Sequence, residues 1–376
     1  MKPILYFVRK EFLQFRRDPK MLAMILVAPI VQLILLGYAA NFDVEIVHTA
    51  VFDQDKSETS RLFIEKFRSS GYFAVDNYVE NYNQLQKLVD GADVILGIVI
   101  PDNFQNKINR NEQATVQAIF DASDGNNASI SAGYVQAVIS DYSQKILIER
   151  MTLSGKGVKS YLPIQAEIRV WYNPELKTRN FMVPGIVGLL LMLITLILTS
   201  LAVVKEKEIG TLEQLIVTPI KPYQLILGKL IPFAILGFIA VILVLTAMSV
   251  VFSISVRGDV LFLFFATFIY ILSTLGLGLF VSTISKTQQQ AMMLAIFTIM
   301  LPMVFLSGFT FPIENMPEAI QYVTYLIPLR YFMTIIRGII LKGTGPADLW
   351  IESLMMLIIG FTILVLSAYR LRKTLG

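Results

Sequence analysis

The sequence Lys205-Glu-Lys-Glu-Ile-Gly-Thr-Leu-Glu-Gln-Leu-Ile-Val-Thr-Pro219 lies between two long uncharged runs, residues 181–204 and 230–252. Each run has the roughly 20 apolar residues that span the hydrocarbon core of a bilayer. Within the charged stretch, the leucines and an isoleucine recur at i, i+3 and i+4, and the proline ends the pattern. The pattern predicts a short helix at a membrane face, suited to docking on a soluble partner. The alternative is a positively charged connector that only sets topology.

The composition indicates an integral membrane protein. The 376 residues are 55% hydrophobic and only 16% charged, whereas soluble domains carry about 25% charged residues. The net charge of +4 gives no reason to expect nucleic acid as a partner. The absence of cysteine excludes disulfides, and His48 is the only histidine, so no metal site is expected.

The hydropathy pattern predicts six membrane spans, at residues 21–40, 181–204, 230–252, 260–284, 288–307 and 349–369. An even number places both termini on one side of the membrane. Outside the spans and the long 41–178 segment, most lysines and arginines fall in the N-terminal arm, the 205–229 loop and the tail 370–376. Basic loops stay in the cytoplasm. The predicted fold is therefore an α-helical polytopic membrane protein with cytoplasmic N and C termini and a membrane domain over 181–369.

Residues 1–20 are predicted to form an amphipathic interfacial helix. Apolar residues share one helical face, and basic residues crowd the rest of the surface. Such helices lie in the plane of the membrane. The alternative is that these cations only fix the orientation of the first span.

Between the first two spans, residues 41–178 have a different, polar composition in which strand-like and helix-like segments alternate. Alternation of this kind predicts an α/β domain. The orientation of the spans places it outside the cytoplasm, because long domains cross the membrane largely regardless of charge.

Near the C-terminus, Gly308-Phe-Thr-Phe-Pro312 interrupts an almost continuous apolar region, and the apolar run after it contains Pro328, Arg330 and Arg337. A seventh span would place the basic tail outside. The segment about 309–342 is therefore predicted to form two outer re-entrant helices, whose irregular backbone must be buried in protein or line water.

The spans contain no energy source. Residues 181–204, 230–252 and 288–307 lack any Asp, Glu, Lys or Arg, so a proton or ion relay is not expected. No phosphate-binding Gly-x4-Gly-Lys-Ser/Thr loop is present. With a single histidine, no catalytic triad is credible either. Transport by this chain would need force from a partner.

Two motifs resemble a known family. The 205–219 stretch looks like the coupling-helix region of ABC-2 type transporter permeases, and Leu306-Ser-Gly-Phe-Thr-Phe-Pro312 with Met316-Pro317 resembles their outer loop before the last span. The order of one span, a large domain and five spans is similar to bacterial multidrug-type exporter permeases with a large extracytoplasmic domain. The resemblance covers the whole chain.

The resemblance implies a permease that is not itself an enzyme and binds no cofactor. It implies a separate ABC ATPase subunit that binds ATP and Mg, a second permease copy or paralogue in a homodimer or heterodimer, membrane lipids, and a possible periplasmic adaptor. It implies an inner-membrane location and export of amphipathic or lipid-like molecules.

The same resemblance assigns candidate residues. The ATPase contact would use Glu206, Glu208, Gly210, Thr211, Leu212, Glu213 and Leu215, with Arg9, Lys10, Arg16 and Arg17 of the interfacial helix as its second edge. The pathway would be lined by Met192, Thr195, Thr199, Phe297, Met300 and Met303, which could instead face lipid or fill helix contacts. Phe309 and Phe311 are candidates for an outer gate.

The rival function is a membrane-tethered ligand-binding or sensor protein that relays a signal through its spans. Its weakness is that no kinase, cyclase or DNA-binding domain follows Lys373. A third possibility, an enzyme that faces outward, is not supported, because the sequence offers no candidate nucleophile and base for it.

Overall fold

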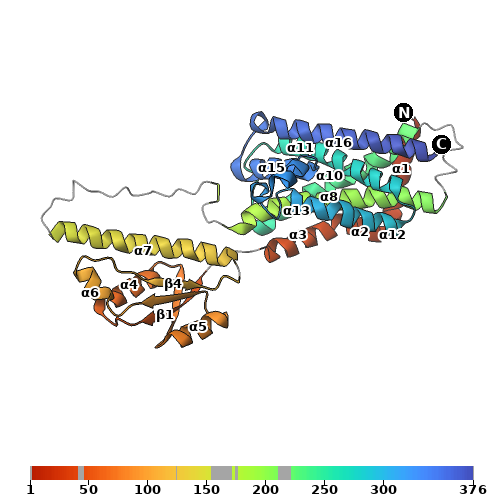
Figure 1. Ribbon diagram of the computed structural model, residues 1–376. Helices are drawn as coiled ribbons and strands as arrows, with labels where there is room; N and C mark the ends of the chain where they lie inside the picture. The colour runs from red at the N-terminus through yellow and green to blue at the C-terminus, as the bar shows by residue number, and fades with distance from the viewer. Residues whose placement is uncertain are drawn as a thin grey trace. The chain divides into compact units, whose positions relative to one another are not determined.

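The computed structural model describes residues 2–40, 46–123, 125–153, 172–173, 177–210 and 222–375. The chain divides into two compact units, a helical unit made of Met1–Asn41 with Val170–Gly376 and an α/β unit made of Phe42–Arg169. Figure 1 shows the elements of each unit.

The helical unit is a polytopic membrane bundle. Five of its described segments are long and apolar enough to cross a membrane. They are α8 (Thr178–Glu208), α10 (Pro222–Phe252), α11 (Val260–Ile284), α16 (Pro346–Leu375) and the run of α12 (Gln288–Met293), π-helix η2 (Leu294–Met300) and α13 (Leu301–Leu306). The start of α1 (Lys2–Arg17) and the end of α16 lie at the same end of this unit (Figure 1).

The first predicted span is divided between two helices, α2 (Pro19–Leu26) and α3 (Ala28–Ala39). The break falls at Val27, two residues before Pro29, whose ring and missing N–H disturb a helix on its N-terminal side. Neither helix reaches the length of a span alone. Placed end to end, the roughly 20 residues would extend about 30 Å, the thickness of the hydrocarbon core.

The segment after the outer loop bends sharply. Helix α14 (Glu318–Thr324) and the run of α15 (Pro328–Arg337) with π-helix η4 (Gly338–Lys342) meet at 83°. The cause is Pro328 at the start of α15, which forces Ile327 into an extended conformation with φ −98° and ψ 112°. The pair forms either one broken span or a re-entrant hairpin, which gives five or six candidate spans among the described residues.

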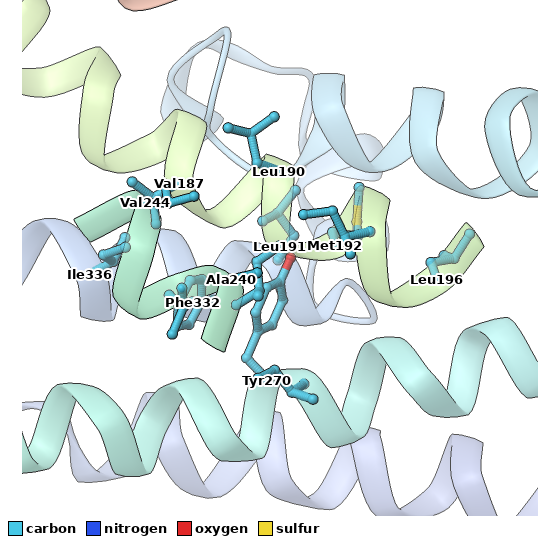
Figure 2. Close-up of a cluster of buried hydrophobic side chains, with 14 of the residues drawn as sticks. Val187, Leu190, Leu191, Met192, Leu196, Ala240, Val244, Tyr270, Phe332 and Ile336 are labelled. Atoms are coloured by element: carbon cyan, nitrogen blue, oxygen red, sulfur yellow. The ribbon is translucent and has the colours of Figure 1, made fainter. Parts of the chain in front are cut away.

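Helix α8 is the most enclosed of the five candidate spans: 67% of its most apolar stretch is buried, against 17% for the segment from Gln288 to Leu306. Figure 2 shows buried side chains of α8 together with side chains of α10, α11 and α15 from the same cluster. The Tyr270 ring of α11 stacks on Phe332 of α15 with centroids 4.1 Å apart. The Tyr270 hydroxyl donates a hydrogen bond to the carbonyl of Gly188 on α8 at 3.2 Å. A displacement of α8 would therefore disturb its contacts with α11 and, through Tyr270, with α15.

The α/β unit has a four-stranded sheet in the order β2-β1-β3-β4. Strands β1 (Val47–Asp53), β2 (Phe73–Tyr78) and β3 (Leu96–Ile100) are parallel, and β4 (Gln117–Phe120) runs antiparallel to β3. The helices are α4 (Glu58–Ser69), α5 (Tyr82–Asp90), α6 (Phe104–Asn109) and α7 (Gly125–Leu153).

Strand β1 alternates its buried residues between the two faces of this sheet. Val47 and Val51 join the core with Phe63 of α4, while Ala50 packs with Leu85 of α5 on the other side. The period of two along the strand explains why both faces carry helices.

Candidate functional site

A cluster of four charged side chains joins three helices at the end of the helical unit where α1 begins. Glu206 near the end of α8 forms ion pairs with Lys229 of α10 and with Lys10 of α1, each N–O distance being 2.8 Å, and it accepts a hydrogen bond from Lys10. Lys229 is only 3% exposed and also donates to the carbonyl of Ala202 at 3.3 Å. The charges of this buried pair offset each other, and the hydrogen bond to Ala202 occupies a further donor of the ammonium.

The last turn of α8 is also tied to the region before α12. Lys207 donates to the carbonyl of Ser285 at 3.1 Å, and the Glu208 carboxylate accepts from the Gln288 side chain at 2.6 Å. Gly210 follows with φ +76°, the left-handed conformation that commonly ends a helix and that glycine adopts without strain. The end of α8 is thus fixed to α1, α10 and α12 just before residue 211.

The structure places the predicted ATPase-contact residues in two groups. Thr211, Leu212, Glu213 and Leu215 lie outside the described residues. Glu206 and Glu208 are bonded within the chain, so their carboxylates hold the end of α8, and their contact with an ATPase stays a prediction. On α1, Arg9, Arg16 and Arg17 are exposed, whereas Lys10 is bonded to Glu206.

Helix α1 lies directly against α10. A Cβ added to Gly228 would lie 2.5 Å from the Cβ of Phe7, so only glycine allows this approach. Phe15 is buried and meets Phe233 of α10 edge-to-face, with ring centroids 5.5 Å apart. The apolar side of α1 therefore packs on protein, and its exposed arginines lie on the remaining surface.

Two members of the charged cluster were not among the predicted site residues. Lys229 stands one residue before an apolar run, where a lysine ordinarily reads as a positive-inside charge. Glu11 is the only acid in a basic helix, and that isolation is the one sequence signal that could have identified it.

Glu11 is buried without a hydrogen-bond partner for its Oε1 atom among the described residues, and Lys10 is 3.9 Å away. Burial raises the pKa of the Glu11 carboxyl above its ordinary 4.5, and Glu206 adds to this, although Lys229 and Lys10 oppose it. Because the folded pKa exceeds the unfolded one, the stabilising contribution of Glu11 is complete below the unfolded pKa and is lost as pH rises through the folded pKa.

We therefore expect Glu11→Gln to melt at the wild-type temperature near about pH 4 and above it at neutral pH, because the variant avoids burying an ionised carboxylate. Thermal unfolding in detergent from acidic to neutral pH measures the difference. A wild type that gains stability over Glu11→Gln as pH rises would contradict the raised pKa.

The predicted pathway residues fall into two environments. Met192, Thr195 and Thr199 of α8 are buried inside the unit, and the Thr195 hydroxyl donates to Thr274 Oγ1 of α11 at 2.7 Å. On the α12–α13 side, Phe297 is 57% exposed. Met300 is half-buried and Met303 is buried. The structure therefore brings the α8 residues together with α11, and leaves Phe297 on the outer surface of the protomer.

The two gate candidates also differ. The Phe309 ring lies against Gly185 of α8, where an added Cβ would be 2.7 Å from it. Phe311 is exposed and stacks on Phe305 with centroids 6.2 Å apart. Only Phe309 is packed on the bundle.

The sequence matches the family described as ABC-2 family transporter protein over residues 19–369. It is 33% identical over 350 residues to the probable multidrug ABC transporter permease YbhS of Escherichia coli (strain K12), covering 93% of this chain and 91% of the relative. It is 31% identical over 343 residues to the probable multidrug ABC transporter permease YbhR of the same organism, covering 91% of each. The inner membrane transport permease YhhJ, also from strain K12, is 24% identical over 98% of this chain and 96% of the relative. The match over nearly all of the chain, together with the apolar bundle, means that this protein belongs to the ABC-2 family of transporter proteins.

Proposed function

We propose that the chain is the permease subunit of an ATP-driven exporter that moves amphipathic or lipid-like small molecules, drugs included, out of the cytoplasm or the inner leaflet. The carrying observation is the family match over residues 19–369 with relatives named as multidrug ABC transporter permeases. Those names favour an exporter over the sensor alternative. The cargo would pass between two copies of the chain or between it and a paralogue.

The geometry at the end of α8 supports a mechanical role. The 205–219 segment would insert into a cleft of a separate ATPase subunit, which binds ATP and Mg. Because Glu206 and Glu208 hold the end of α8 to three neighbouring helices, a push on this segment would move them together. The buried contacts of α8 with Tyr270 and Phe332 would carry the movement into the core of the bundle.

The proposed topology places the protein in the bacterial inner membrane with both termini in the cytoplasm. The α/β unit would then lie on the outer side, where it would cap the exit or dock a periplasmic adaptor. Lys10 of α1 and Lys229 both pair with Glu206, so the two basic segments lie at one end of the helical unit. This arrangement supports the proposed orientation.

We expect Leu212→Arg combined with Glu213→Arg to abolish most co-purification of a co-expressed ATPase subunit, because the change removes an apolar anchor and reverses a charge in the predicted contact. The variant keeps Glu206 and Glu208, whose carboxylates hold the end of α8, so the bundle should fold normally. The measurement is the ratio of ATPase to permease after affinity purification in detergent.

The matched control is Leu62→Arg on α4, a leucine that is 58% exposed in the α/β unit. It should leave the ratio unchanged. An undiminished ratio in the Leu212/Glu213 variant would remove the docking role of this segment.

A further inference from the structure

A cavity of about 450 Å³ lies where the start of α8, the loop after α13 and the end of α15 meet. Its wall includes Phe181, Ser307, Arg337, Lys342 and Thr344. None of these residues belongs to the charged cluster at the end of α8. The cavity is large enough for the polar head of a small amphiphile and part of its chain.

The Arg337 guanidinium has more N–H donors than the described residues accept hydrogen bonds from. Its Nε donates to the carbonyl of Phe181 at 3.3 Å, and its two terminal nitrogens donate to the carbonyls of Gly308 and Phe309 at 2.8 and 3.4 Å. A guanidinium has five N–H groups. Three are thus engaged, and no carboxylate among the described residues forms an ion pair with it.

Two hydroxyl groups on the cavity wall lack partners. Ser307 is 1% exposed, and neither its Oγ nor Thr344 Oγ1 has a hydrogen-bond partner among the described residues. Buried hydroxyls are ordinarily satisfied, and an unsatisfied one lowers stability. Rotation of χ1 between staggered positions is enough to turn such an oxygen toward a ligand.

A purely structural role for Arg337 accounts for only part of this arrangement. Two of its carbonyl contacts hold the loop at Gly308, where φ is +78°, and the guanidinium also lies 3.6 Å over the Phe181 ring. They leave two N–H groups of the guanidinium and both hydroxyls unexplained. The charged side chains that line the cavity are Arg337, Lys342 and Glu314, so the net charge of the wall is positive.

Two glycine residues let helix backbone pack closely against these groups and so fix their positions. A Cβ on Gly185 would lie 3.1 Å from Arg337 Nη2, and one on Gly338 would lie 2.6 Å from Thr344 Oγ1. Larger residues at either position would displace the guanidinium or the hydroxyl.

We propose that this cavity binds the anionic headgroup of an amphiphile, with its phosphate or carboxylate oxygens held by Arg337, Ser307 and Thr344. Arginine suits such anions because its planar donors match their oxygens. The apolar part of the ligand would lie against Phe181, Met333 and Leu341, which line the same cavity. The inference goes beyond export and does not depend on it.

The test is lipid retention by the purified chain in neutral detergent, measured by native mass spectrometry. Phosphatidylglycerol and phosphatidylcholine with identical acyl chains are offered separately, with and without millimolar inorganic phosphate. We expect roughly tenfold stronger retention of phosphatidylglycerol, and a loss of most of that preference in Ser307→Ala/Thr344→Val. This variant removes only unpartnered oxygens, so it should fold even if Arg337→Gln does not.

The matched control is Thr246→Val, whose hydroxyl already donates to the carbonyl of Ile242 on α10. It should keep the wild-type preference. A preference that phosphate leaves intact supports a lipid headgroup as ligand, and one that phosphate removes supports a free anion at the same groups. Equal retention of the two lipids, or a preference unchanged in the double variant, overturns the proposal. Since the readout is binding, failure of the proposed export function would not produce either result.

Discussion

Replacing Lys229 with methionine is expected to lower the free energy of unfolding by about 3–5 kcal/mol, because it leaves a buried carboxylate without its principal partner. Lys229 Nζ is 2.8 Å from Glu206 Oε2, and the lysine is almost fully buried. Methionine has a similar shape, so packing is largely kept and the effect reports the charge. Denaturant unfolding in mixed micelles measures it.

Lys10→Met is the matched control, because Lys10 pairs with the same Glu206 at the same distance but its side chain is 43% exposed. Water screens such a pair, so the loss should be no more than about 1 kcal/mol. The double variant Glu206→Gln/Lys229→Met should recover much of the stability lost in Lys229→Met. Equal losses in the two lysine variants would show that burial does not set the strength of this cluster.

Replacing Gly278 with alanine is expected to destabilise the bundle by about 1–3 kcal/mol, because α8 and α11 touch through their backbones at this position. An added Cβ would lie 2.6 Å from the carbonyl oxygen of Leu196 and 2.8 Å from the Cβ of Thr199. Small residues allow membrane helices to approach this closely, and backbone atoms cannot move aside as a side-chain tip can. Thermal unfolding in detergent measures the loss.

Gly345→Ala provides the comparison, since no heavy atom lies within 4 Å of a Cβ added there. Its effect should stay within about 0.5 kcal/mol, as for surface substitutions in general. A Gly278 variant as stable as the Gly345 variant would mean that α8 and α11 can separate without cost.

The sequence predicted the helical membrane class because long uncharged runs have few alternatives to spanning a bilayer. The apolar runs at 181–204, 230–252, 260–284, 288–307 and 349–369 lie on α8, α10, α11, the α12–α13 run and α16, and α10 begins eight residues earlier, at Pro222. The division of the first span at Val27 depends on Pro29, and the 83° bend depends on Pro328. Prolines signal such interruptions, but the angle they produce is set by packing.

The candidate site was less accessible to sequence reasoning. The 205–219 stretch could be recognised, yet the pairing of Glu206 with Lys229 and Lys10 joins residues far apart in the chain. Buried and exposed positions could not be separated on the spans, because their helices are apolar on every side. Met192 and Phe297 looked alike in sequence and lie in opposite environments.

The π-helix η2 (Leu294–Met300) has a consequence for comparing relatives residue by residue. A π-turn holds one residue more than an α-turn. The residues beyond it are therefore shifted by about 100° from the positions that a regular helical wheel would give them. Met292 and Phe305, on either side of η2, are therefore out of phase on any regular helical wheel. A relative with a single-residue gap in this segment would form a regular α-helix here and still present the same face of α13 to its surroundings.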